Sequence, residues 1–282
     1  MNTFKSTLLL VLLTVFLIFI GDRFGGRNGM VLAFVLSVAF NFGTYFFSDK
    51  LALRMYNAQP VTREQLPRAY AAVERLTAKQ GLPTPKIYVL PTESPNAFAT
   101  GRNPQHASVA VTHGILQLLD DEELEGVLAH ELGHVRNRDI LTSSIAATLA
   151  GAITMVARMG YYASLFGGGG GRDRRGGGGL SGLLMIIVAP IAASLIQLWI
   201  SRTREFEADA TGAATTGNPY ALARALQKLE HYSKRIPMQA SPSNAHLFIV
   251  APLLGSGGIG NLFSTHPPMK ERIQRLIGRD HI

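Results

Sequence analysis

The chain has 282 residues, of which 47% are hydrophobic and only 16% are charged, and its formal net charge is +8. Soluble proteins carry about 25% charged residues, so this composition argues against a purely soluble domain and against a disordered chain. The absence of cysteine excludes a disulfide scaffold, an iron–sulfur cluster, a cysteine-ligated zinc site and a thiol nucleophile.

Two uncharged apolar segments begin the chain, at 6–20 and 29–47. A membrane-spanning helix needs roughly 17–25 mainly apolar residues, so the second segment is long enough and the first needs its flanking residues. The first segment also resembles the apolar part of a signal peptide, but no small-residue cleavage site follows it. We expect residues 1–47 to form a transmembrane hairpin.

The stretch 48–139 is polar enough to form the first part of a soluble domain. A capping box at Thr62 and Gln65 predicts a helix that ends at Gly81. Apolar alternation and turn signals then predict a small antiparallel sheet, with strands over 86–90, 96–101 and 107–112. A strong helix follows over 120–138, because Asp120 can cap it and three acidic residues suit its first turn.

A second pair of apolar segments occupies 140–200, joined by the Gly-rich loop 167–179. The pair is consistent with two more spanning helices. Because Arg158 interrupts it, the pair is also consistent with a buried soluble hairpin. If all four segments span, one side of the membrane holds 21 of the 27 lysines and arginines. The positive-inside rule places that side in the cytoplasm. A basic surface beside anionic lipid then accounts for the net charge without nucleic acid.

The final stretch, 201–282, completes the soluble domain. Asn218 and Pro219 open a predicted helix to about residue 235, a long irregular segment covers 236–265, and a short helix closes the chain over 269–277.

The sequence HELGH at 130–134 lies in the middle of the predicted 120–138 helix. His130 and His134 are one helical turn apart, so both imidazoles leave the same face and can reach one metal ion. Glu131 is placed to contact water activated by that ion, and there it would act as general base. The alternative is two helix histidines with unrelated contacts, but two histidines and a glutamate on a half-buried helix are costly without a partner.

A catalytic zinc ion usually has three protein ligands, and the third has to come from another segment. Glu205 and Asp209 share a helix face, so one can bind the ion while the other orients a ligating imidazole. We assign Glu205 to the metal and Asp209 to the imidazole; the alternative is a charged helix start with salt bridges to Arg202 or Arg204. Because Glu205 must meet the two histidines, an even number of membrane crossings has to separate them, which the 140–200 pair supplies.

On these residues the chain resembles the HtpX family of membrane-bound zinc metalloproteases, relatives of the CAAX prenyl protease and of the thermolysin-like gluzincins. The resemblance covers nearly the whole chain: two N-terminal spans, HELGH, a second hydrophobic pair, SRTREFEAD at 201–209 and STHPP at 264–268. It implies an inner-membrane, multi-pass endopeptidase with its active site facing the cytoplasm. Such a protease acts in quality control on misfolded or damaged membrane proteins or on unfolded polypeptides. It also implies Glu205 as the third ligand of one Zn²⁺ per chain.

Two further motifs take their meaning from the resemblance. Asn96, Ala97 and Phe98 resemble a strand beside the metal, where a substrate peptide can add as an extra strand and Asn96 can bind its carbonyl. Otherwise Asn96 is a turn residue before a strand. His266 resembles a histidine near the oxyanion, supported by Arg272 in the substrate site, or else it only caps the last helix.

The fold expected is α+β and mainly helical: an integral membrane protein with about four transmembrane helices and a zincin-like catalytic domain. Three rival functions stay open at this point: a prenyl-protein protease, a non-catalytic scaffold or chaperone with a structural metal, and a transporter. The sequence does not predict an oligomeric state.

Overall fold

The structure is a computed structural model, and it describes residues 2–139, 202–233, 235–236, 249 and 267–278. The second hydrophobic pair at 140–200, most of the irregular segment 236–265 and His266 lie outside the described residues.

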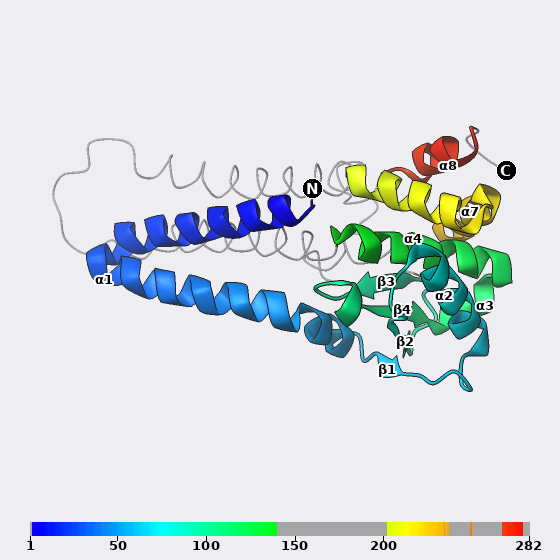
Figure 1. The fold of residues 1–282 in the computed structure, drawn as a ribbon, viewed down its shortest axis with the longest axis horizontal. Helices are drawn as coiled ribbons and strands as arrows, with labels where there is room; N and C mark the ends of the chain where they lie inside the picture. The colour runs from blue at the N-terminus through cyan, green and yellow to red at the C-terminus, as the bar shows by residue number, and fades with distance from the viewer. Residues whose placement is uncertain (1, 140–201, 234, 237–248, 250–266, 279–282) are drawn as a thin grey trace.

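The long N-terminal helix α1 (Asn2–Met55) extends away from the other elements (Figure 1) and carries both N-terminal apolar segments. It is broken at Gly26, whose backbone has φ 54° and ψ −147°, a conformation that glycine adopts far more easily than other residues. Within the described part of the chain, no helix combines the length and the apolarity that crossing a bilayer requires.

Helix α2 (Pro67–Gln80) follows the short strand β1 (Gln59–Pro60) and begins later than the capping box predicted. The Thr62 N–H donates to Gln65 Oε1 at 2.8 Å, but this bond closes a turn that precedes the helix. The helix itself starts with Pro67, whose fixed φ suits a first helical position. Its predicted end is confirmed, since Gly81 takes a left-handed conformation there with φ 66°.

The sheet contains β1, β2 (Lys86–Leu90), β3 (Ala97–Thr100) and β4 (Ser108–Thr112), in the order β1-β2-β4-β3. The three predicted strands are confirmed, but the prediction of an antiparallel sheet is wrong, because β2 and β4 pair in parallel. Strands β3 and β4 form a hairpin that is closed by the short helix η1 (Pro104–His106). Strand β4 of this hairpin pairs with β2, so β3 is the edge strand.

Both faces of this sheet are buried, which explains its continuous apolar runs. Ile87, Val89 and Val109 face the main core beneath α2 and the helix that carries HELGH. Leu90 and Phe98 face the opposite way and pack against the last turns of α1.

Helix α4 (Asp121–Asn137) carries the HELGH sequence and follows the short helix α3 (His113–Leu118). Asp120 caps it as predicted: the Glu123 N–H donates to Asp120 Oδ1 at 2.9 Å, and the Asp120 N–H donates to Glu123 Oε2 at 3.1 Å. The helix ends at Arg138, which is left-handed with φ 58°.

Helix α7 (Pro219–Ser233) packs against α4, and α8 (Met269–Ile277) packs against α7 (Figure 1). Residues 202–216 form another helix, which crosses α4. The 202–216 helix approaches α4 so closely that a Cβ at Gly212 would lie 3.0 Å from the His130 backbone nitrogen. At Gly133 a Cβ would lie 3.3 Å from Ala208 Cα. Small residues at this crossing therefore bring the side chains of the two helices within reach of each other.

Candidate metal centre

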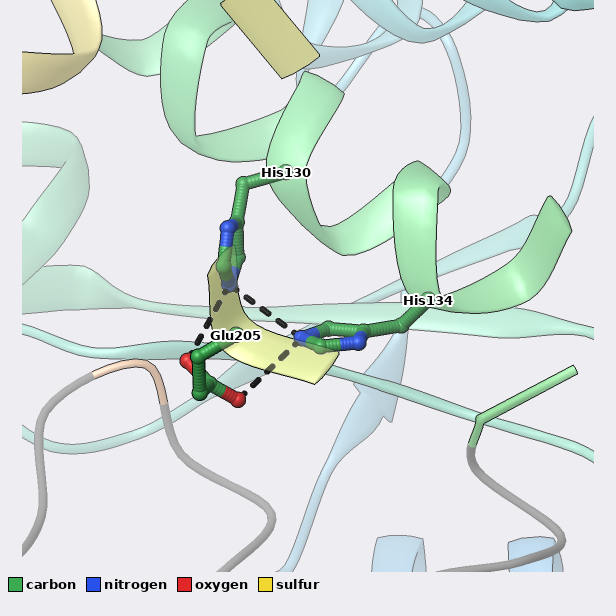
Figure 2. Close-up of side chains that lie close together, drawn as sticks. All are labelled: His130, His134 and Glu205. Carbon is green, nitrogen blue, oxygen red and sulfur yellow. Dashed lines mark hydrogen bonds and ion pairs between the residues drawn. The ribbon is translucent and has the colours of Figure 1, made fainter. Parts of the chain in front are cut away.

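His130 and His134 leave the same face of α4 and point toward Glu205 of the 202–216 helix (Figure 2). Their Nε2 atoms lie 3.2 Å apart. Glu205 Oε2 lies 3.6 Å from His130 Nε2, and Glu205 Oε1 lies 3.4 Å from His134 Nε2. The three residues thus offer ligand atoms that all lie within 4.8 Å of one another.

The separations between these atoms fit a tetrahedral metal ion. Zinc–ligand bonds of about 2.0–2.1 Å place neighbouring tetrahedral ligand atoms about 3.3–3.4 Å apart. The separations in the structure, 3.2, 3.4 and 3.6 Å, lie around that value, with Oε2 of Glu205 facing His130 and Oε1 facing His134. Two imidazoles and one carboxylate are also the ligand types of one common kind of catalytic zinc site, which keeps its fourth position open.

Each imidazole is oriented by a carboxylate at its other nitrogen. His130 Nδ1 lies 2.8 Å from Asp209 Oδ1, which is the contact that the sequence pattern predicted. His134 Nδ1 lies 3.2 Å from Asp139 Oδ2, a contact that the sequence analysis missed. A carboxylate at Nδ1 holds the proton there and leaves the Nε2 lone pair available for a metal ion.

Arg272 of α8 lies fully buried beneath this site. Its Nε lies 2.8 Å from Asp209 Oδ2, and its Nη2 lies 2.7 Å from Asp209 Oδ1. Its Nη1 lies 3.4 Å from Glu205 Oε2. Burial alone would raise the pKa of Asp209, but the Arg272 guanidinium lowers it to about 2. Arg272 therefore contacts the carboxylates beneath the site, and its expected contact with substrate stays a prediction.

The site buries more carboxylates than guanidinium groups. With every carboxylate ionised and both imidazoles neutral, its four carboxylates and two guanidinium groups would carry a net charge of −2; these groups belong to Glu131, Asp139, Glu205, Asp209, Arg204 and Arg272. Burial raises the pKa of Glu131 to about 8. Burial would lower the pKa of His134, but its carboxylate neighbours raise it to about 10. A buried cluster that favours added positive charge suits a divalent cation.

Glu131 lies between the metal ligands and the edge strand of the sheet. Its side chain is buried, and its Oε2 accepts the Ala99 N–H of β3 at 2.8 Å. This bond holds the carboxylate predicted to act as general base against the strand beside the site.

The predicted substrate strand is the buried edge strand β3. Asn96 Oδ1 accepts the Ala97 N–H at 3.1 Å, and Ala97 O accepts the Ile249 N–H at 3.2 Å. Phe98 packs on the far face of the sheet against α1. The roles of Asn96, Ala97 and Phe98 in substrate binding stay predictions.

Comparison with known proteins decides the family. The profile described as "Peptidase family M48" matches residues 64–280. The chain belongs to peptidase family M48. It is 55% identical to a "Protease HtpX homolog" of Desulfatibacillum aliphaticivorans, over 98% of this chain and 89% of that one. It is also 55% identical to the "Protease HtpX homolog" of Syntrophobacter fumaroxidans, over 98% of both chains.

The family makes the chain a metalloprotease, a hydrolase of peptide bonds, and confirms the resemblance to HtpX proteases. Among solved structures, S. mikatae Ste24p is similar with a TM-score of 0.57 and 21% identity. The match covers 95% of this chain and 62% of that longer one, and it supports the fold alone. Membership in M48 implies a bound metal, and the group of His130, His134 and Glu205 is suited to hold it.

Proposed function

We propose that this metalloprotease is a zinc-dependent, membrane-bound endopeptidase that hydrolyses misfolded or damaged membrane proteins. His130, His134 and Glu205 hold one zinc ion per chain. The observation that carries the proposal is the buried meeting of these three side chains: the two Nε2 atoms lie 3.2 Å apart, and the Glu205 carboxylate faces His134 with Oε1 at 3.4 Å and His130 with Oε2 at 3.6 Å.

In the proposed mechanism a bound zinc ion supplies Lewis acidity toward the peptide carbonyl and lowers the pKa of water. Glu131 takes the proton from the attacking water and returns it to the leaving amine. Asp209 and Asp139 keep the two imidazoles oriented throughout. His266 donates a hydrogen bond to the oxyanion, and Asn96 binds a substrate carbonyl.

The membrane part of the proposal rests on the sequence and on the relatives. Residues 1–47 and 140–200 form two hairpins, about four transmembrane helices in all, in a bacterial-type inner membrane. Residues 48–139 and 201–282 form the catalytic domain on the cytoplasmic side. The lysine and arginine distribution and the identity to HtpX proteases over 98% of the chain support this arrangement.

The general base is tested by Glu131→Gln in the full-length protein. The exchange is isosteric, so we expect one zinc ion per chain to be retained while cleavage of an unfolded or membrane substrate falls by about 10²–10⁴-fold. Glu122→Gln, in the same helix but exposed, is the matched control and should cleave like the wild type. Undiminished proteolysis by Glu131→Gln would remove the mechanism.

The third ligand is tested by Glu205→Ala, with metal analysis of the purified protein. We expect loss of both bound zinc and proteolysis. Glu207→Ala changes an exposed carboxylate of the same helix and should leave both unchanged. Full zinc occupancy in Glu205→Ala would place the third ligand elsewhere.

A further inference from the structure

Asp139 occupies an unusual place beside the metal ligands. It lies just beyond the end of α4, where the left-handed Arg138 turns the chain, and its side chain is only 2% exposed. This turn brings the carboxylate back along the helix, so that Oδ2 lies 3.2 Å from His134 Nδ1.

Arg204, the residue before Glu205, contacts the backbone of Asp139. Its Nη1 donates to the Asp139 carbonyl oxygen at 2.9 Å, across 65 positions of the chain. The Arg204 residue is 7% exposed. A guanidinium group is costly to bury unless its N–H groups find acceptors, and here the Asp139 carbonyl oxygen is one of them.

With the contacts of Asp139 to His134 and of Arg204 to Asp139, both imidazoles are connected to the 202–216 helix. His130 is tied to the helix that carries Glu205 directly, because Asp209 lies on that helix. His134 is tied to the same helix through Asp139 and Arg204. Each histidine of α4 thus has its own connection to the 202–216 helix.

We propose that Asp139 and Arg204 are positioning residues that hold His134 and Glu205 at metal-binding separation before the ion arrives. The inference rests on the proposed zinc site. Asp139 fixes the imidazole through Nδ1, and Arg204 fixes Asp139 relative to the backbone that bears Glu205. Ligands held in place before binding raise metal affinity, because less order has to be imposed when the ion binds.

The experiment measures the zinc dissociation constant of the full-length, detergent-solubilised protein by competition with a chelator. Oriented carboxylates of this kind contribute about 10–100-fold to metal affinity, and we expect that loss in Asp139→Ala. Arg204→Met should weaken zinc binding about tenfold, and Arg204→Lys should recover part of the loss because an ammonium can still donate to the carbonyl. Arg202→Met, at an exposed position of the same helix, is the control.

A merely structural role predicts a different result. In that case the melting temperature in saturating zinc falls while the zinc dissociation constant stays within about twofold of the wild type, and this outcome overturns the inference. If Asp139→Ala does not fold, Asp139→Asn replaces it, because the isosteric amide keeps the packing but weakens the hold on Nδ1–H. An unchanged zinc affinity in Asp139→Asn and Arg204→Met would equally refute the proposal.

The same measurement separates this inference from the proposed function. A wild-type protein that binds no zinc refutes the proposed function and the inference together. A wild-type protein that binds zinc, with variants that bind it equally well, refutes only the role of Asp139 and Arg204.

Discussion

Replacing Arg272 by methionine tests how far the buried ionic network depends on one guanidinium group. Arg272 is fully buried, and both its Nε and its Nη2 contact the Asp209 carboxylate. Removing one partner of such a pair leaves the other charge buried, at a cost of about 3–5 kcal/mol. For a protein of this size that cost corresponds to a fall of roughly 6–20 °C in melting temperature.

The measurement is a thermal melt of the detergent-solubilised protein followed by circular dichroism, with and without zinc. Lys270→Met changes an exposed cation of the same helix and should shift the melting temperature by less than about 2 °C. The double variant Arg272→Met with Asp209→Leu should regain part of the stability, because no charge is left uncompensated at that position. It should not regain zinc affinity, since His130 has then lost the carboxylate at Nδ1.

A single variant Arg272→Met that melts within about 2 °C of the wild type would contradict this reasoning. It would mean that the Asp209 carboxylate is neutralised or compensated in another way when the guanidinium is absent, and that the short contacts between the two groups contribute little to stability.

Three further results are expected. Gly212→Ala should lower the free energy of unfolding by about 1–3 kcal/mol and weaken zinc binding, because its Cβ would lie 3.0 Å from the His130 backbone nitrogen. Gly43→Ala is the control and should change neither, because no heavy atom lies within 4 Å of its Cβ. Equal melting curves for the two variants would refute the close packing at Gly212. Asp120→Ala should lower stability by about 0.5–2 kcal/mol in a denaturant titration while zinc content stays unchanged, and a loss of zinc would show that the cap reaches the site. Removing the metal with a chelator should abolish proteolysis and lower the melting temperature, with added zinc restoring both; cleavage by the metal-free protein would contradict a metal-dependent mechanism.

The elements predicted correctly from the sequence are those with local causes. Helix α4 follows from its cap at Asp120, its acidic first turn and its apolar face, and the predicted end of α2 follows from the left-handed glycine at Gly81. The order of the strands has no local cause. Strand β4 lies between β2 and β3, and this order depends on how the sheet packs against α1, α2 and α4. The sequence of a single strand contains no information about that packing.

In the candidate site too, the contacts that follow from local spacing were predicted, and those that depend on the fold were missed. Residues spaced by one helical turn, such as Glu205 and Asp209, can be paired from the sequence, and the structure brings both to the histidines. Asp139 was missed because its position depends on the left-handed turn at Arg138, an uncommon conformation for arginine. The burial of Arg272 was missed because an arginine in a short amphipathic helix ordinarily faces solvent.

The bond between Glu131 and Ala99 uses a main-chain group at the outer edge of β3. The Ala99 N–H donates to Glu131 Oε2 at 2.8 Å, and the Ala97 carbonyl of the same edge accepts the Ile249 N–H at 3.2 Å. A substrate peptide that added to this edge as an extra strand, as the sequence predicts, would have to displace both bonds. Displacement of the first bond would free the Glu131 carboxylate, so peptide alignment and release of the proposed base would be a single event.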